Sequence, residues 1–242
     1  MPQMLAGQSA SWLALLDLYD KVPTGWTLIG GQLVHLHCAE RNGYPDRPTD
    51  DIDAVVDIRA DVTMLARFTR ALVDLGFEPD TSGDGLQHRW NNGAAQIDVL
   101  LPDGVGATAA SRRGAGGAPS LPTPGGSQAL RRSEMVRVRV GGREGSVLRP
   151  NLVGALVMKA AAHTVPAAGR GRHRIDFVVL AALLDRTDFS LSQVTKKDRQ
   201  RLLAMVDACR NDSTAMLVDH AEQNLGRLER AAELGAAVGR RL

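Results

Sequence analysis

The sequence predicts an α+β protein in which a mixed β-sheet flanked by helices is followed by a helical region. Short β-prone runs alternate with amphipathic helical patterns as far as about residue 150, and only helical patterns follow. The chain has 242 residues, of which 44% are hydrophobic, so it can bury a substantial core. We therefore expect an α/β domain over 1–150 and a helical domain over 151–242.

In the first part of the chain, the hydrophobic pattern predicts helices and strands in alternation. Apolar residues recur every three or four positions in the expected helices and are concentrated in short β-prone runs in the expected strands. The expected helices are 11–21, 32–40 and 61–75, and the expected strands are 26–31, 51–58, 86–90 and 95–101.

Residues 103–130 differ in composition from the rest of the chain. They are rich in Gly, Ala, Ser and Pro and contain no aromatic residue. Such a segment buries too little apolar surface to offset the entropy of ordering it, so we expect a mobile loop. The strict alternation of VRVRV predicts a strand over 136–140. In the helical region that follows, Thr195 and Asp198 have the spacing of a capping box.

Composition excludes several classes of protein. The longest apolar runs are far shorter than the ~18 residues that cross a membrane, and the N-terminus does not resemble a signal peptide. The two cysteines, Cys38 and Cys209, are far apart and form no metal-binding or disulfide pattern. We therefore expect a cytoplasmic protein with reduced thiols and no membrane partner.

Charge is distributed unevenly along the chain, although the formal net charge is only +2. Residues 1–104 hold 7 Lys/Arg and 15 Asp/Glu, a net charge of 7 − 15 = −8, whereas 131–175 hold 10 and 2, a net charge of 10 − 2 = +8. An acidic part that holds cations and a basic part that meets phosphates would fit a polyanionic substrate. Chance segregation of surface charge is the alternative. The arginines of GRGRHR at 169–174, expected in a loop, could grip phosphates or simply be solvated.

Three aspartates form the candidate metal site. Asp51 and Asp53 are two apart in a predicted strand, so their side chains point to the same face. Asp98 lies in the middle of the apolar strand 95–101, where an unpaired carboxylate is costly. If the two strands are neighbours, the three carboxylates converge and repel one another unless cations lie between them. Oxygen ligands of this kind suit Mg²⁺ or Mn²⁺, and two such ions ~3.5–4 Å apart support phosphoryl or nucleotidyl transfer.

Gly30 and Gly31 precede a predicted helix. Glycines at the start of a helix let backbone N–H groups approach an anion such as phosphate. Any tight strand-to-helix turn has the same pattern, so the pair gains meaning only from the aspartates that follow it.

In this order, the motifs resemble the nucleotidyltransferase superfamily, which has a polymerase-β-like fold, and most closely the AbiEii/MenT toxins of bacterial toxin–antitoxin systems. The resemblance covers roughly residues 26–185. It implies a nucleotidyltransferase-like sheet in 1–150, with NTP as substrate. The matching motifs are IGG at 29–31, RPTDDID at 47–53, QIDVLLP at 96–102, LRPNLVGALVMK at 148–159 and RID at 174–176.

The resemblance also assigns roles to individual residues. Lys159 would bind nucleotide phosphates, and Asp176 would position Lys159 or the acceptor. The catalytic set is then Asp51, Asp53, Asp98, Lys159 and Asp176. The nucleotide-binding set is Gly30, Gly31, Gln32, Arg47, Thr49 and Lys159.

Two positions depart from the family pattern. Gln32 replaces the Ser or Thr that often follows the glycine pair, and its amide would have to donate to the phosphate instead. Val179 stands where many members have a second aspartate, so the helix there is expected to be more buried. Two further alternatives stay open from the residues alone. Lys159 could extend its head into solvent from an apolar helix, and Arg89 could meet either the nucleotide or Trp90.

The sequence therefore predicts a metal-dependent enzyme that transfers a nucleotide from an NTP to an RNA acceptor. The resemblance implies tRNA as that acceptor, a toxin role and a cognate antitoxin. A small-molecule nucleotidyltransferase of the antibiotic-resistance kind is an enzymatic alternative. A catalytically silent nucleotide-binding protein of the same fold is another, although clustered charges are costly to keep without a function.

Overall fold

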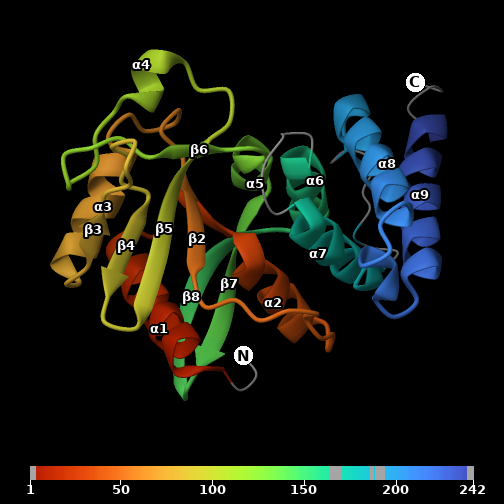
Figure 1. Ribbon diagram of the computed structural model, residues 1–242, viewed down its shortest axis with the longest axis horizontal. Helices are drawn as coiled ribbons and strands as arrows, with labels where there is room; N and C mark the ends of the chain where they lie inside the picture. The colour runs from red at the N-terminus through yellow and green to blue at the C-terminus, as the bar shows by residue number, and fades with distance from the viewer. Residues whose placement is uncertain (1–3, 164–169, 186–187, 189–193, 239–242) are drawn as a thin grey trace.

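A six-stranded mixed sheet lies at the centre of the α/β part of the protein (Figure 1). The computed structural model describes residues 4–163, 170–185, 188 and 194–238. Five strands follow the order β1-β2-β5-β4-β3, and β6 pairs with β5. Pairing is parallel for β2·β5 and β5·β6 and antiparallel elsewhere in this sheet. The strands are β1 (Trp26–Ile29), β2 (Ile52–Val56), β3 (Glu78–Asp80), β4 (Arg89–Asn92), β5 (Ala95–Pro102) and β6 (Leu121–Thr123).

Burial explains why β1 and β5 were visible in the sequence. β1 is buried along its whole length, and β5 is buried at all but one of its eight positions. Near-continuous apolar runs are typical of strands covered on both faces. By contrast, β3 has the sequence EPD, with two exposed residues and one partly buried one, so no hydrophobic pattern predicts it. The strand expected over 86–90 instead begins at Arg89 and forms β4.

The helices α1 (Ala6–Lys21), α2 (Gly30–Glu40) and α3 (Met64–Asp74) flank the sheet. Trp12 of α1 and Phe68 of α3 are fully buried, and Phe68 meets the ring of Trp26 edge to face with centroids 5.6 Å apart. The mixed sheet flanked by helices confirms the predicted fold class. No helix within the described residues is long and apolar enough to cross a membrane.

A hairpin of β7 (Ser133–Val140) and β8 (Arg143–Pro150) forms a separate two-stranded sheet. Its turn residues, Gly141 and Gly142, have φ values of +54° and +86°, which glycine adopts without strain. The strand expected over 136–140 is confirmed as part of β7. The sequence did not predict β8, because its first half, REGS, has no alternation of apolar and polar residues.

The segment 103–130, expected to be a mobile loop, contains short helices and a strand. This segment contains α4 (Ala107–Ala110), β6 and α5 (Gly126–Arg131). It is also anchored to the rest of the fold by polar contacts. Arg112 donates to the carbonyl of Ile58 over 2.9 Å, and the N–H of Ala115 donates to the hydroxyl of Thr69 over 2.7 Å. Hydrogen bonds and short elements replace the apolar burial that the composition lacks.

The region after Pro150 is helical, as predicted (Figure 1). The capping box at Thr195 and Asp198 is present at the start of α8. The GRGRHR run was expected in a loop, but α7 begins at Arg170, so its last five residues are helical. The elements are α6 (Leu152–His163), α7 (Arg170–Ala182), α8 (Lys196–Arg210), the 3₁₀ helix η2 (Ala215–Leu217) and α9 (Ala221–Val238).

A buried ion pair joins α5 to the helical region. The guanidinium of Arg132, at the end of α5, lies 2.8 Å from a carboxylate oxygen of Asp198, and their side chains are 7% and 1% exposed. The same oxygen accepts from the hydroxyl of Thr195. Loss of one partner would leave the other charge buried without this ion pair.

Replacing Asp198 with alanine should therefore destabilise the fold strongly. We expect Asp198→Ala to lower the free energy of unfolding by about 3–5 kcal/mol, the typical result of breaking a buried pair. Asp207→Ala, at an exposed position of the same helix, is the matched control and should change it by less than about 0.5 kcal/mol. Urea denaturation measures both. Equal stability of the two variants would contradict a structural role for the pair.

Candidate active site

The sheet brings the three predicted aspartates together. Asp53 on β2 lies directly opposite Asp98 on the parallel strand β5, and Asp51 immediately precedes β2. Carboxylate oxygens of all three lie within 4.8 Å of one another. Among the described residues, this is the only group of three or more His, Cys, Asp or Glu side chains close enough to share a metal ion. The convergence expected from the sequence is therefore present.

The environment of the acidic cluster disfavours the ionised form of Asp53. Burial and the neighbouring charges of Asp51 and Asp98 raise the pKa of Asp53 from 3.8 to about 7, although Lys159 and Arg47 act in the opposite direction. A proton or a cation is thus needed to stabilise the cluster near neutral pH. Three hard oxygen donors in this space fit Mg²⁺ or Mn²⁺.

The other two aspartates have polar partners. Asp51 accepts a hydrogen bond from the hydroxyl of Thr49 over 2.7 Å. Asp98, which is 6% exposed, accepts two hydrogen bonds from the guanidinium of Arg89, over 3.1 and 3.0 Å. The sequence left two interpretations of Arg89 open, a nucleotide contact or a cation beside Trp90. Neither predicted this pairing with Asp98.

Glycine is required where α2 starts beside the acidic cluster. Gly30 has a φ of +76°, and a Cβ atom there would lie 1.8 Å from the Oδ2 of Asp53. A Cβ on Gly31 would lie 2.8 Å from the Cγ2 of Thr49. The N-terminal end of α2 can therefore approach Asp53 and Thr49 closely only without side chains. This end carries partial positive charge and backbone donors suited to a phosphate.

Lys159 and Asp176 form an ion pair next to Gly30. The ammonium of Lys159 on α6 donates to Asp176 on α7 over 2.6 Å and to the carbonyl of Gly30 over 3.1 Å. Because Lys159 is only 2% exposed, the alternative of a lysine with its head in solvent is wrong. Arg47 adds two hydrogen bonds to Asp176, over 3.1 and 3.0 Å. Burial opposes the ionisation of Asp176, but Lys159 and Arg47 outweigh it and hold its pKa below the usual value.

Gln32 does not offer its side chain to a phosphate, contrary to the prediction. The side chain is fully buried, accepts from the indole of Trp12 over 2.8 Å and donates to the carbonyl of Thr49 over 2.6 Å. It therefore links α1 to the segment that carries Thr49 and Asp51. Only the backbone of Gln32 remains for a nucleotide. Val179 is buried, as expected for an apolar position of α7.

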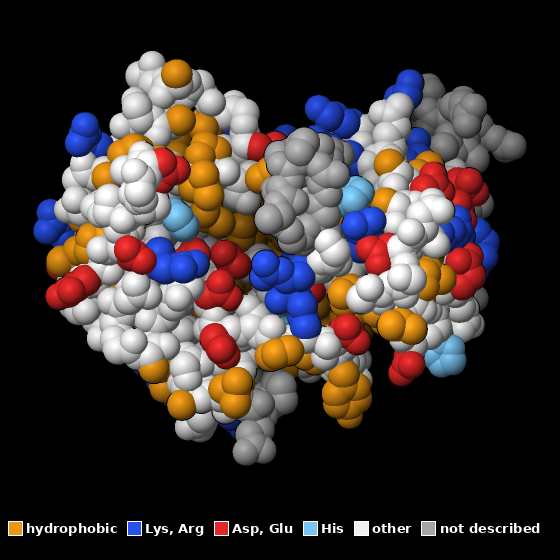
Figure 2. Space-filling model, in the orientation of Figure 1, with side chains coloured by type: hydrophobic (Ala, Val, Ile, Leu, Met, Phe, Trp, Pro, Cys, Tyr) orange, Lys and Arg blue, Asp and Glu red, His pale blue; other side chains and the backbone are white. Residues whose placement is uncertain are grey.

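Much of the charge in the basic stretch 131–175 is paired within the protein. Acidic and basic side chains also lie next to one another near the centre of the face seen in Figure 2. The stretch is therefore less cationic toward a ligand than its net charge indicates. The pairs are Arg132–Asp198, Arg139–Glu144, Arg143–Asp17, Arg143–Asp20, Arg149–Glu40, Arg149–Glu134, Lys159–Asp176 and Arg174–Asp212.

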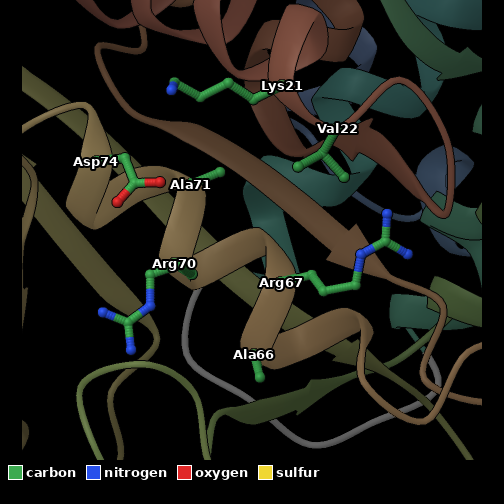
Figure 3. A pocket seen from close by; sticks show the side chains of 7 residues that line it. All are labelled: Lys21, Val22, Ala66, Arg67, Arg70, Ala71 and Asp74. Atoms are coloured by element: carbon green, nitrogen blue, oxygen red, sulfur yellow. The ribbon is translucent and has the colours of Figure 1, made fainter.

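A separate pocket of about 580 Å³ lies between the end of α1 and α3 (Figure 3). None of the acidic-cluster residues contributes to it. It is open and mixed in charge, and Arg67 at its edge is paired with Asp61. Its lining residues are Lys21, Val22, Ala66, Arg67, Arg70, Ala71 and Asp74.

The mixed sheet and its flanking helices have the fold of a nucleotidyltransferase-like protein of known structure. No family model matches the sequence, and no curated protein matches it either. The structure is similar to an antigenic nucleotidyltransferase-like protein from Paracoccidioides brasiliensis, with a TM-score of 0.52 and 14% identity over 88% of this chain and 93% of that one. It also matches the antibiotic-resistance factor ANT(2'')-Ia, with a TM-score of 0.45 and 13% identity over 85% of this chain and 98% of that one.

The raised pKa of Asp53 makes the stability of the metal-free protein depend on pH. Its pKa is higher in the folded state, so the stability it contributes is full below about pH 4 and is lost as pH rises through about 7. Asp53→Asn cannot ionise and should be more stable than the wild type at about pH 8 in EDTA, on the order of 1–3 kcal/mol. Thermal unfolding at about pH 5 and about pH 8 measures the difference, which should shrink at the lower pH.

Addition of Mn²⁺ provides the second half of this test. Mn²⁺ should stabilise the wild type at the higher pH, because ligand binding to the folded state raises its stability, and should stabilise Asp53→Asn much less. Asp50→Asn, an exposed neighbour, is the control and should behave as the wild type. Identical responses of wild type and Asp53→Asn to pH and Mn²⁺ would rule out this account of the cluster.

Proposed function

We propose that this protein is a metal-dependent nucleotidyltransferase that transfers a nucleotide from an NTP to an acceptor hydroxyl. The convergence of Asp51, Asp53 and Asp98 beside the glycine-initiated end of α2 carries the proposal. An acidic cluster that holds divalent cations next to a helix N-terminus that receives phosphate supplies both needs of this reaction. The fold shared with a nucleotidyltransferase-like protein supports it.

The reaction forms one bond and breaks another at the α-phosphorus. The acceptor oxygen bonds to the α-phosphorus, the bond to the bridging oxygen of the β-phosphate breaks, and pyrophosphate leaves. Mg²⁺ or Mn²⁺, held by the three aspartates, would lower the pKa of the attacking hydroxyl and neutralise charge on the triphosphate. The hydroxyl proton passes to a carboxylate oxygen of the acidic cluster.

Other residues orient the triphosphate and the metal ligands. The backbone N–H groups of Gly30 and Gly31 face the phosphate at the start of α2, and Thr49 orients Asp51. Lys159 has three N–H donors, of which Asp176 and the Gly30 carbonyl use two among the described residues. The third donor would meet a phosphate oxygen if the triphosphate enters this buried space. Asp176 positions both Lys159 and Arg47 for this contact.

For the acceptor, we propose RNA, with tRNA as the first candidate and a toxin role regulated by a cognate antitoxin. The order of the motifs, which resembles AbiEii/MenT toxins, supports this choice. Exposed Arg172 supports it too, because it lies one helical turn from Asp176 on the same face of α7. A small-molecule acceptor is the second candidate. The internal pairing of the basic stretch favours it, because such an enzyme needs no extended cationic surface.

Nucleotidyl transfer is tested directly with labelled nucleotides. Wild-type protein incubated with each α-labelled NTP, Mg²⁺ and total RNA should give a labelled RNA band on a gel. Asp51→Asn should lower transfer by at least about 100-fold, because an amide cannot supply the anionic oxygen that holds Mg²⁺. Asp50→Asn is exposed and adjacent, so it serves as the matched control and should keep wild-type transfer.

The same assay separates the enzyme from a catalytically silent protein. Transfer to RNA or to a panel of small hydroxyl acceptors supports the enzyme. NTP binding without transfer to any acceptor would support the silent nucleotide-binding alternative. Wild-type transfer by Asp51→Asn would show that the acidic cluster is not the active site.

Salt dependence of binding distinguishes the two acceptors. If RNA is the acceptor, each neutralised phosphate contributes roughly −0.9 to the slope of log affinity against log salt for a duplex. Arg172→Glu and Arg137→Glu should weaken RNA binding at low salt and leave NTP binding nearly unchanged. Arg67→Glu, on α3, is the control for a general charge change. Salt-independent RNA affinity in wild type and both variants would favour the small-molecule acceptor.

A further inference from the structure

One arginine lies in line with the acidic cluster on the sheet. Across the neighbouring strands β2, β5 and β4, Asp53 is directly opposite Asp98, and Asp98 is directly opposite Arg89. Directly opposite residues project to the same face of a sheet. Asp98 is therefore held between a carboxylate on one side and a guanidinium on the other.

The contact between Arg89 and Asp98 is two-pronged. The Nε donates to Oδ1 over 3.1 Å and the Nη2 donates to Oδ2 over 3.0 Å. A carboxylate offers about four lone-pair positions; this fork uses two of them, one on each oxygen, and the amide of Gln96 approaches Oδ1 over 3.5 Å. A carboxylate oxygen of Asp98 also lies within 4.8 Å of carboxylate oxygens of Asp51 and Asp53.

The charges of the cluster also indicate a single bound cation. Three ionised aspartates and the guanidinium of Arg89 sum to two negative units, which a single divalent cation would neutralise. Lys159 and Arg47 also oppose the charge of Asp53, but both are paired with Asp176. Arg89 also acts on Asp51 electrostatically, so its charge is felt across the cluster and not only at Asp98. A second divalent cation beside Asp98 would have to displace this fixed charge or bind close to it.

We propose that Arg89 is a positioning residue that takes the place of a second cation beside Asp98, so that the protein without substrate binds one divalent cation. This inference rests on the acidic cluster being the metal site of the proposed function. The guanidinium orients Asp98 toward the cation that Asp51 and Asp53 share. Arginine suits this role because its planar fork matches a carboxylate and stays charged at all physiological pH values.

The test counts bound metal without using the transfer reaction. Mn²⁺ is titrated into nucleotide-free protein at about pH 8, where Asp53 is mostly ionised, and free Mn²⁺ is measured by electron paramagnetic resonance. The wild type should bind one Mn²⁺. Arg89→Gln should gain a second site, at least about 10-fold tighter than any second site of the wild type, because a unit charge a few ångströms away is removed.

Two further variants serve as controls. Arg89→Lys keeps the charge without the fork, so it should still bind one Mn²⁺. Arg67→Gln removes an arginine that forms an equivalent ion pair on α3, with Asp61 at 2.7 Å, and should match the wild type. Circular dichroism reports whether each variant is folded.

Several outcomes would overturn the proposal. Two sites of similar affinity in the wild type would do so, and so would unchanged stoichiometry and affinity in folded Arg89→Gln. If Arg89→Gln does not fold, the wild-type stoichiometry together with that of Arg89→Lys decides. Absence of any Mn²⁺ site in the wild type would overturn the metal site as well. One bound Mn²⁺ without nucleotidyl transfer would count against the proposed function alone.

Discussion

Repulsion among three aspartates at the centre of the sheet is the constraint to which the surrounding structure responds. The sheet register places Asp53 and Asp98 directly side by side, and Asp51 adds a third charge. Like charges this close destabilise the folded state unless positive charge or hydrogen-bond donors oppose them. Thr49 donates a hydrogen bond to Asp51, and Arg89 donates to Asp98. Asp53, in contrast, has a raised pKa. The fold thus retains an electrostatic cost at the position where a cation would remove it, which is typical of sites that trade stability for function.

A second charged group connects this site to the helical region. Asp176 on α7 receives hydrogen bonds from Lys159 on α6 and from Arg47, which precedes the acidic motif, and Lys159 also reaches the carbonyl of Gly30. Each partner is buried or half-buried, so removing any one would leave a neighbouring charge poorly compensated. The helices after Pro150 are therefore part of the site itself, because they fix the residues that surround the start of α2.

The sequence predicted the structure correctly where a single local pattern determines it. The two-residue period of a strand placed Asp51 and Asp53 on one face, and the apolar run around Asp98 identified its strand. The pairing of Arg89 with Asp98 depends on the register between β4 and β5, which no local pattern encodes. Gln32 was assigned by its place in a motif, whereas its burial depends on packing against Trp12, twenty residues earlier. The segment 103–130 was misjudged because composition reports apolar burial and not anchoring hydrogen bonds.

The uneven distribution of charge has an explanation within the fold. Two arginines of the basic stretch pair with acids from the acidic first part of the chain: Arg143 meets Asp17 and Asp20, and Arg149 meets Glu40. The β7–β8 hairpin is thereby attached to α1 and to the end of α2 through charges of opposite sign. The exposed pairs of Arg143 add little stability each, but all of these pairs reduce the field that a distant polyanion would experience. A substrate would then be attracted by individual exposed charges, such as Arg172, and not by the basic stretch as a whole. The opposite net charges of the two parts of the chain are therefore explained mainly by the ion pairs that join these parts to each other.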